Sequence, residues 1–328
     1  MNSQPLVSIG LFVYNGERYI REALDSFLGQ TFTDFELIIS DNASTDRTEE
    51  ICKEYVARDG RVRYSRNAQN MGAGWNVRRV VELATGKYFK WAACDDLCEP
   101  RFLERCVAAL EADPSLVLAH TRTRVIDEQG NFIENYGCQL RTADRDPLVR
   151  LEDLLLVGHR CYQIFGVIRM GALKSVPPQG SYVHSDRVLL LQLGMLGPYH
   201  EDPEFLFVSR KHNQQSVWTM PTRVSVKRFR LTNHYGTLPS PEWWDPAKRT
   251  KIAFPEWFVM REYCRSIGRA PLSFGQRLRG YGLLGRWIKQ YYRRLVKDLV
   301  VAADQILYIL QTKFSRTPKL KSVERESA

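Results

Sequence analysis

The sequence predicts an α/β fold in which a mostly parallel sheet is flanked by helices and followed by a basic, largely helical C-terminal extension. Strand-like apolar runs alternate with amphipathic helical segments over the first 120 residues, and no tight hairpin separates them. Parallel strands need long crossover connections, so this alternation favours a parallel sheet. Residues 1–220 carry 25 Lys and Arg against 29 Asp and Glu, whereas residues 221–328 carry 22 against 8. This change in charge predicts a domain at 1–220 and an extension at 221–328.

The elements of the first half follow from the spacing of apolar residues. Residues 6–14 (LVSIGLFVY) form a continuous apolar, β-branched run, which is typical of a strand buried on both faces. Apolar residues then recur at helical spacing over residues 17–30. The same criteria predict strands at 35–40, 62–65, 88–93 and 116–121. They also predict three helices, of which one starts after Asp46 and the others cover 75–83 and 102–112.

The pattern is weaker in the second half. Residues 121–174 indicate mixed strands and loops with one helix near 151–157, followed by a helix at 186–196 and a strand at 204–210. After residue 220 the sequence becomes rich in Pro and Trp, and basic amphipathic helices follow. The 1–220 domain is therefore expected to consist of two halves, 1–120 and 121–220.

Cysteine usage and hydropathy predict a cytoplasmic location. The seven cysteines are odd in number and form no CxxC pair, which favours reduced thiols over disulfides. The N-terminus has no basic segment before its apolar run, so it does not resemble a secretory signal. No window approaches the ~18 apolar residues of a membrane span.

Polar side chains follow three of the predicted strands. Tyr14-Asn15 ends the first strand, Asp41 ends the second, and Asp95-Asp96 ends the strand at 88–93. Ligands of open parallel sheets bind beyond the carboxyl ends of the strands, so we expect these groups to share a crevice. Adjacent carboxylates suit Mg²⁺ or Mn²⁺ bridging a diphosphate. The alternative is a solvated helix cap before Glu99.

Four segments of the chain resemble the family 2 glycosyltransferases. They are PLVSIGLFVYNGERYIREALDSFLGQTFTDFELIISDNASTDRTEEI (5–51), NMGAGWN (70–76), GKYFKWAACDD (86–96) and HSDRVLLLQLGMLG (184–197). The resemblance covers roughly residues 5–215. It implies a GT-A type, Rossmann-like sheet, with a nucleotide-sugar half at 1–120 and an acceptor half at 121–220.

The resemblance also implies roles for residues that contact the donor. Val13 and Tyr14 match the positions that contact the nucleotide base, the Tyr by stacking. Asp41 matches the carboxylate that bonds the base, usually uracil. Arg66, together with residues 70–72, falls in the segment that closes near the diphosphate. Phe12-Val13 stands where the family often has Pro-Thr, so a side-chain hydrogen bond is lost there.

A metal site is implied in the same way. Asp96 matches the metal ligand, and Asp95 the residue that holds the ribose or the diphosphate. Cys94 replaces the leading Asp of the commoner motif. Arg210 and His212 match an Arg-x-His that lies near the diphosphate and the metal, and the imidazole would complete the shell of Mn²⁺ or Mg²⁺. An ordinary surface position is the alternative for His212.

The resemblance assigns the general base to Asp186, at the start of a helix where the family has an acidic pair. Ser185 departs from that pair, and an N-cap is the alternative role for Asp186. One base without a covalent nucleophile implies inversion at the sugar carbon. The Gln-x-x-Arg-Trp motif of processive synthases is absent from NQQSVW (213–218), which favours transfer of one sugar per encounter.

These inferences predict an inverting, metal-dependent, non-processive glycosyltransferase of the hexosyltransferase class. The donor is expected to be a UDP-sugar, and the acceptor a glycan or lipid-linked glycan of cell-surface polysaccharide. One alternative, a nucleotidyltransferase, would need a Gly-rich phosphate loop, yet residues 12–20 contain a single glycine. The other alternative is a nucleic-acid-binding protein that uses the basic tail. The sugar, the linkage and the oligomeric state have no readable code in the sequence.

The basic tail suggests a further partner. Residues 277–297 mix Arg and Lys with Leu, Trp, Ile and Tyr, as expected of an amphipathic helix lying on an anionic membrane surface. A helix docked on the catalytic domain is the alternative. We therefore expect a cytoplasmic protein with peripheral association to the inner face of the membrane, and no nucleic acid partner.

Overall fold

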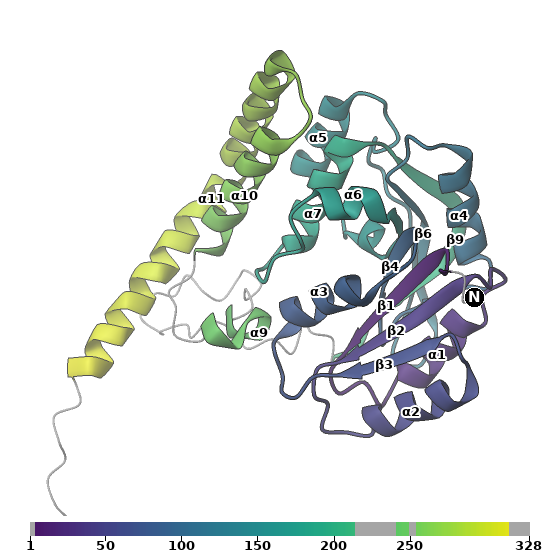
Figure 1. Cartoon of the computed structure of the whole chain (residues 1–328). Coiled ribbons are helices and arrows are strands. Elements are labelled where there is room, and N and C mark those ends of the chain that lie inside the picture. The colour runs from purple at the N-terminus through teal and green to yellow at the C-terminus, as the bar shows by residue number, and fades with distance from the viewer. Residues whose placement is uncertain (1–3, 214–240, 249–253, 315–328) are drawn as a thin grey trace, which may run out of the picture.

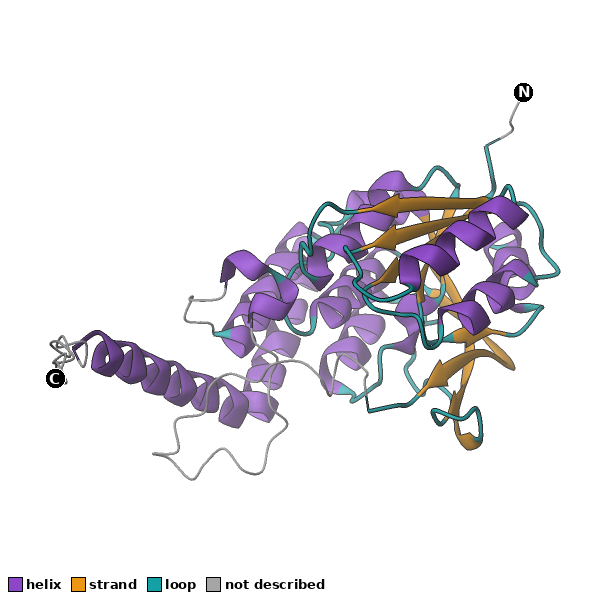
Figure 2. Cartoon of the chain, turned by 90° about the horizontal axis from the view of Figure 1, so that it is seen from below, coloured by secondary structure: helices purple, strands orange, loops and turns teal. Residues whose placement is uncertain are grey.

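The computed structural model describes residues 4–213, 241–248 and 254–314. Its strands form one sheet in the order β3-β2-β1-β4-β8-β6-β9-β5, with β7 paired to β6 (Figure 1). Helices cover both faces of this sheet (Figure 2). The α/β architecture expected from the sequence is confirmed.

The first half alternates strands and helices as predicted. Parallel pairing joins β1 (Val7–Val13) to β2 (Phe35–Asp41) and to β4 (Tyr88–Ala93), and β2 to β3 (Val62–Arg66). The helices between them are α1 (Ile20–Leu28), α2 (Thr48–Arg58), α3 (Ala73–Leu83) and, after β4, α4 (Phe102–Ala112).

The second half adds antiparallel strands that the sequence left as mixed structure. β8 (Val167–Arg169) runs antiparallel to both β4 and β6 (Leu118–Ile126), and β7 (Phe132–Tyr136) forms an antiparallel pair with β6. β9 (Tyr199–Arg210) lies parallel to β6, and β5 (Leu97–Cys98) pairs antiparallel with β9. Short elements are α5 (Pro147–Leu156), η1 (Tyr162–Phe165), α6 (Met170–Ser175) and α7 (Ser185–Leu196).

The sheet separates two apolar cores. On one face, β1 contributes Val7, Ile9 and Leu11 to a core completed by α1, α2 and α4. On the other face, Phe89 and Trp91 of β4 join a core built by α3, α5 and α7. Adjacent residues of β4 point to opposite faces, as the two-residue period of a strand requires. The continuous apolar sequence of these strands reflects burial on both sides.

The C-terminal helices form a hairpin against the second core. α10 (Pro255–Arg269) and α11 (Phe274–Phe314) pack on each other and on α5 and α7 (Figure 1). Leu284 and Trp287 of α11 are buried in the same core as α7. α9 (Pro241–Trp244) and η3 (Pro246–Lys248) lie near α3. The predicted boundary at 220/221 falls outside the described residues, and the two-domain division remains a prediction.

None of the described helices, α11 included, combines the length and the apolar content that crossing a bilayer requires.

A buried carboxylate ties together three elements of the first half. Glu36 on β2 accepts hydrogen bonds from the Ser8 hydroxyl (2.7 Å) and from the Thr85 amide (2.9 Å) and hydroxyl (2.6 Å), and it pairs with Arg63. Burial raises the pKa of Glu36, but these hydrogen bonds outweigh burial, and the net shift is downward. A depressed carboxyl pKa stabilises the fold above the carboxyl's unfolded pKa, and that stabilisation is lost as the pH falls through the folded value.

We expect Glu36→Gln to lower the free energy of unfolding by about 1–3 kcal/mol at neutral pH, because the charge-assisted bonds are lost while the amide stays buried. The difference from the parent should shrink as the pH falls below about 4.3, the usual Glu pKa, because the parent's own carboxyl then becomes protonated. Urea unfolding curves across this pH range measure both effects. A difference that does not change with pH would show that the carboxylate charge is not the stabilising feature.

Candidate functional site

Strand register brings the predicted donor residues to one edge of the sheet. Val13 on β1 lies beside Asp41 on β2, and Phe12 lies beside Ala93, the last residue of β4. The loops that follow these strands therefore begin side by side. The segments that carry Tyr14, Asp41 and Asp95-Asp96 therefore start from one edge of the sheet, and the shared crevice stays a prediction.

The loops after β1 and β2 are tied together. Asn15 has a left-handed backbone (φ 53°), and its side-chain oxygen accepts a hydrogen bond from the Thr45 amide (2.8 Å). The Asn15 amide donates to the Ser44 hydroxyl (2.9 Å). Asn tolerates this conformation better than most residues, which explains an Asn at this position. These two hydrogen bonds fix the backbone position from which the Tyr14 side chain projects.

The two residues assigned to the base differ in exposure. Tyr14 is 48% exposed, whereas Val13 is 2% exposed. The Val13 side chain packs in the core, and its carbonyl accepts hydrogen bonds from the Asn42 amide (2.9 Å) and the Asn76 side chain (3.2 Å). The ring of Tyr14 is therefore the accessible stacking surface at this strand end.

Asp41 is fully buried and organises its own loop. One carboxylate oxygen accepts from the Ser44 amide (2.8 Å), and the other accepts from the Tyr64 hydroxyl (2.6 Å) and lies 3.5 Å from Arg66. Burial and the Asp41 charge raise the pKa of Tyr64 well above its usual range. Arg66 also pairs with Glu49 (3.0 Å) and donates to the Ser44 carbonyl (2.7 Å). Asp41 and Arg66, predicted separately, are thus direct neighbours.

Asp95 and Asp96 lie between β4 and β5, where the end of β9 contacts them. Asp96 is 5% exposed, and its carboxylate accepts a hydrogen bond from the Arg210 amide (3.1 Å). Burial, and then the neighbouring Asp95 charge, raise the pKa of Asp96 well above the ordinary carboxyl range. The adjacent carboxylates therefore favour one proton or one cation between them.

Arg210 and His212 fold back onto this pair. Arg210 donates to the Asp95 carbonyl (3.3 Å) and pairs with Glu22 of α1 (2.5 Å). The Nε2 atom of His212 lies 2.9 Å from a carboxylate oxygen of Asp95. Tyr19 holds both side chains, with its ring centroid 4.8 Å from the Arg210 guanidinium carbon and 4.7 Å from the His212 ring centroid. The sequence did not single out Tyr19 or Glu22.

The donor chemistry of this cluster suits a divalent cation. Asp95, Asp96 and His212 supply two carboxylates and an imidazole, and the Nδ1 atom of His212 is buried without a hydrogen-bond partner among the described residues. Within the same residues, however, no three His, Cys, Asp or Glu side chains converge on a common point. The side chains that could bind a cation are present, but His212 Nε2 and one Asp95 oxygen are engaged in a hydrogen bond with each other.

Asp186 lies in a second cluster at the start of α7. It is partly buried, and one of its carboxylate oxygens accepts a hydrogen bond from the Arg187 amide (2.8 Å). Burial, and then the nearby Asp186 charge, raise the pKa of the Cys161 thiol. The Sγ atom of Cys161 lies 3.6 Å from Nδ1 of His159, whose Nε2 atom is buried without a partner among the described residues. Burial, and then the nearby Arg187 charge, lower the pKa of His159 to about 4. A neutral His159 and the Cys161 thiol thus lie near Asp186.

The backbone around Asp186 is strained. Cys161 (φ 60°) and His184 (φ 63°) both adopt the left-handed conformation although neither is glycine. Such conformations cost of order 1–3 kcal/mol each and cluster at functional sites. The sequence gives little signal for this strain, because Cys is not typical of the conformation and His, although enriched in it, adopts it only in a minority of cases.

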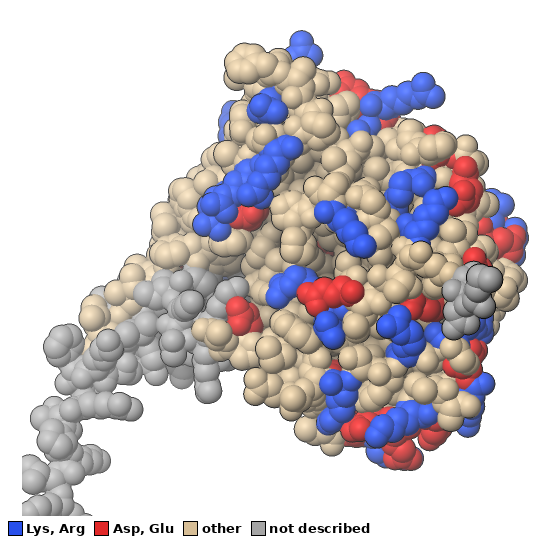
Figure 3. All heavy atoms as spheres, viewed as in Figure 1, with Lys and Arg blue, Asp and Glu red and all other residues tan. Residues whose placement is uncertain are grey.

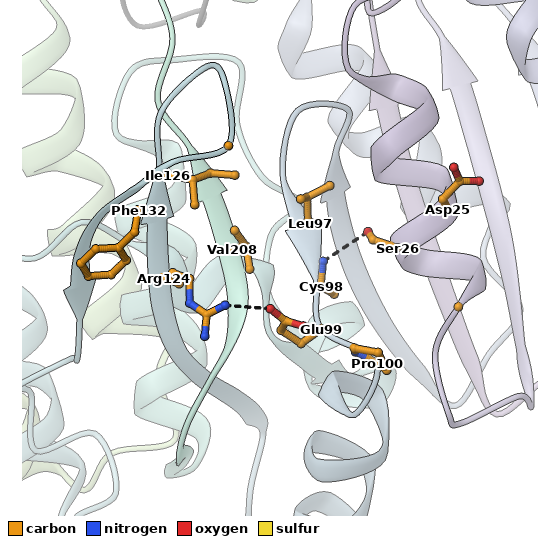
Figure 4. A pocket seen from close by; sticks show the side chains of 12 residues that line it. Asp25, Ser26, Leu97, Cys98, Glu99, Pro100, Arg124, Ile126, Phe132 and Val208 are labelled. Atoms are coloured by element: carbon orange, nitrogen blue, oxygen red, sulfur yellow. Dashed lines mark hydrogen bonds and ion pairs between the residues drawn. The ribbon is translucent and has the colours of Figure 1, made fainter.

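The part of the chain that the structure describes contains no hydrogen bond or ion pair between Asp186 and Asp95 or Asp96. An open cleft of about 610 Å³ lies between α1, β5 and the β6, β7 and β9 strands, lined by Leu97, Arg124, Phe132 and Val208 among others (Figure 4). None of the predicted site residues lines this cleft. A single pocket that contains all of these carboxylates therefore remains a prediction.

The chain matches the model of a protein family. Residues 8–172, half of the chain, match the model described as glycosyl transferase family 2. An uncharacterized glycosyltransferase of Haemophilus influenzae is 30% identical over 247 residues, which are 71% of this chain and 74% of that protein. The chain therefore belongs to the family 2 glycosyltransferases, and it is a glycosyltransferase.

Other relatives match over a shorter segment of this chain. The chondroitin synthase of Escherichia coli is 40% identical over 131 residues, which are 40% of this chain and 19% of the synthase. The matched segment spans less than half the length of several curated relatives.

The fold also matches a solved structure. S. aureus TarS 1–349 in complex with UDP-GlcNAc superposes with a TM-score of 0.61 at 17% identity, over 88% of this chain and 72% of TarS 1–349. The GT-A type fold expected from the sequence is confirmed.

Tyr19 offers a test of how the end of β9 is held. Tyr19→Leu removes the ring that contacts Arg210 and His212, so we expect the free energy of unfolding to fall by about 1–3 kcal/mol. Tyr19→Phe removes only a hydroxyl that is buried without a hydrogen-bond partner among the described residues. This control should change stability by less than about 0.5 kcal/mol, because no hydrogen bond is lost. Urea unfolding measures both, and equal costs for the two variants would contradict a role for the ring contacts.

Proposed function

We propose that this enzyme transfers a sugar from a UDP-sugar to a glycan or lipid-linked acceptor in the synthesis of a cell-surface polysaccharide. The observation that carries the proposal is the set of strand ends that brings Tyr14, Asp41 and Asp95-Asp96 to one edge of the sheet. TarS has been solved with UDP-GlcNAc, and similarity to chondroitin synthase and to a hyaluronan synthase supports a polysaccharide product. Family membership disfavours the nucleotidyltransferase and nucleic-acid-binding alternatives.

Each residue at this edge has a chemical task in the proposal. The exposed Tyr14 ring stacks on the base, with Val13 supporting it from the core. Asp41 bonds the base or orders the loop that meets it. Arg66, held by Glu49, supplies a cation toward the diphosphate.

A divalent cation fits the second part of the site. Asp96 and His212 would hold Mn²⁺ or Mg²⁺, while Asp95 orients the ribose or the diphosphate and Arg210 faces the phosphates. When bound, the cation would offset the charge that develops on the departing nucleoside diphosphate. The buried Asp96 carboxyl must lose its proton to act as a ligand, and a neighbouring cation favours that ionised form.

Asp186 is proposed as the general base. It accepts the proton of the acceptor hydroxyl, and the hydrogen bond that the Arg187 amide donates to its carboxylate restrains its orientation. Direct attack by that hydroxyl, with one base and no covalent intermediate, inverts the configuration at the sugar carbon. NQQSVW, on which the non-processive prediction rests, lies almost wholly outside the described residues, so single-sugar transfer stays a proposal.

The first test is donor binding. We expect UDP to raise the Tm of the protein more with Mn²⁺ than without it, and Asp96→Asn to abolish the Mn²⁺-dependent part, because a carboxamide is a poorer cation ligand. Asp34→Asn, at an exposed carboxylate before β2, is the matched control and should behave as the parent. Thermal shift with UDP, GDP and dTDP separates the bases. An unchanged Mn²⁺ response in Asp96→Asn would refute the metal assignment.

The second test separates binding from turnover. We expect Asp186→Asn to keep the UDP-induced Tm shift and to lose about 10²–10⁴-fold in turnover, the usual contribution of a general base. Turnover is measured as UDP release in the presence of glycan or lipid-linked acceptors. Asp186→Glu should restore part of the activity. If Asp186→Asn turns over as the parent does, the base must be another residue.

A further inference from the structure

We propose that the exposed face of α11 binds the surface of a bilayer that contains anionic lipids. This face is distinct from the sugar-transfer site, so the proposal concerns how the enzyme is placed and not how it reacts.

An apolar stripe runs along the solvent side of α11. Large apolar side chains with 36–83% exposure recur at spacings of three, four or seven residues: Phe274, Leu278, Tyr281, Ile288, Tyr292, Val296, Leu299, Ile306 and Leu310. Val300, which is 37% exposed, lies to one side of this row. At about 100° per residue, these positions all lie within roughly 40° of one direction around the helix axis. A single large exposed apolar side chain needs no explanation, but a continuous stripe of this length marks an interaction surface.

The stripe is not the seam by which α11 attaches to the rest of the protein. The attaching face buries Leu284, Trp287 and Leu295, each at most 6% exposed. Asp298 on the same side accepts a hydrogen bond from the Glu256 amide at the start of α10 (3.0 Å). The sequence leaves two alternatives open for this helix, docking on the catalytic domain and binding to a membrane surface. One face of α11 docks on the domain, and a different face remains exposed for the second role.

The charge of α11 identifies the partner. Residues 274–297 contain seven Lys and Arg and no Asp or Glu. Lys289 is exposed beside the stripe, and Arg279 and Arg286 are exposed further round the helix on the same side, where Arg286 pairs with Glu152 (2.6 Å). Figure 3 shows basic side chains gathered on the α10–α11 hairpin. Apolar and aromatic side chains flanked by cations suit the boundary between acyl chains and anionic headgroups.

Other occupants of the stripe carry the wrong charge. A second copy of α11 would bring seven further cations against these seven. Residues 214–240 of the same chain contain four Lys and Arg and no acidic residue, and residues 315–328 contain four against two. Like charges repel across an interface, so a headgroup layer of opposite charge is the complementary surface.

The position of α11 gives such binding a use. α11 packs on α5, and α10 packs on α7, the helix whose first turn carries Asp186. A bilayer held along α11 would keep lipid-linked acceptors close to the enzyme. This last link rests on the proposed function, whereas the binding itself does not.

Co-sedimentation of the full chain with vesicles tests the proposal. We expect binding to vesicles that contain phosphatidylglycerol, at least ten-fold weaker binding to pure phosphatidylcholine, and loss of binding at high salt, because exposed charges are screened. Leu278→Glu with Tyr292→Glu should reduce binding at least ten-fold. Phe132→Glu with Ile133→Glu, at exposed apolar residues of β7, is the matched control and should bind as the parent does.

Three further measurements separate membrane binding from dimerisation and from a defect at the donor site. Arg279→Gln with Lys289→Gln should weaken binding to anionic vesicles while leaving the apolar stripe intact. Parent-like binding by Leu278→Glu with Tyr292→Glu would overturn the proposal, as would a concentration-dependent dimer in size-exclusion chromatography that this variant abolishes. The UDP-induced Tm shift should be unchanged in all these variants, so failure of vesicle binding is distinguishable from failure of the donor site.

Discussion

The register of three parallel strands is the constraint on which the rest of the structure depends. Because β1 pairs with β2 and β4 over their full lengths, the chain must leave all three strands at the same edge. Loops that are distant in sequence are then held within reach of one another, and a fully buried Asp41 fixes one of them. A one-residue slip in either pairing would turn the apolar side chains of the strand away from their cores.

The polar site is assembled from both halves of the chain. β9 returns beside β6 and delivers Arg210 and His212 to Asp95 and Asp96, more than a hundred residues earlier. Tyr19 and Glu22, from the first helix, complete the enclosure. Asp96 is buried beside the partly exposed Asp95, and burial, followed by the neighbouring charge, raises the pKa of Asp96, so a cation bound at this edge would favour the ionised form of Asp96.

α11 shows how one helix meets two environments. Its buried side extends the core formed by α5, α7 and α10, while its exposed side carries apolar and basic residues together. A helix that only docks on a domain covers its apolar residues and leaves its charges in water, whereas α11 leaves a row of large apolar residues exposed as well as its charges. The spacing of apolar residues in the sequence predicts an amphipathic helix, but it does not show which of these residues face the protein and which face solvent.

The sequence by itself determined the order of strands and helices, the carboxylates at the strand ends and the basic character of the tail, because these follow from local periodicity and composition. Tertiary structure alone decided that Asp41 is buried against Tyr64 and Arg66, and that the Tyr19 ring contacts both Arg210 and His212. It also decided that Cys161 and His159, which contact each other, lie near Asp186. It also decided the antiparallel strands β7 and β8, whose short segments carry little periodic signal. The physical reason is the same in each case: contacts between residues far apart in sequence depend on sheet register and helix packing, which no local pattern encodes.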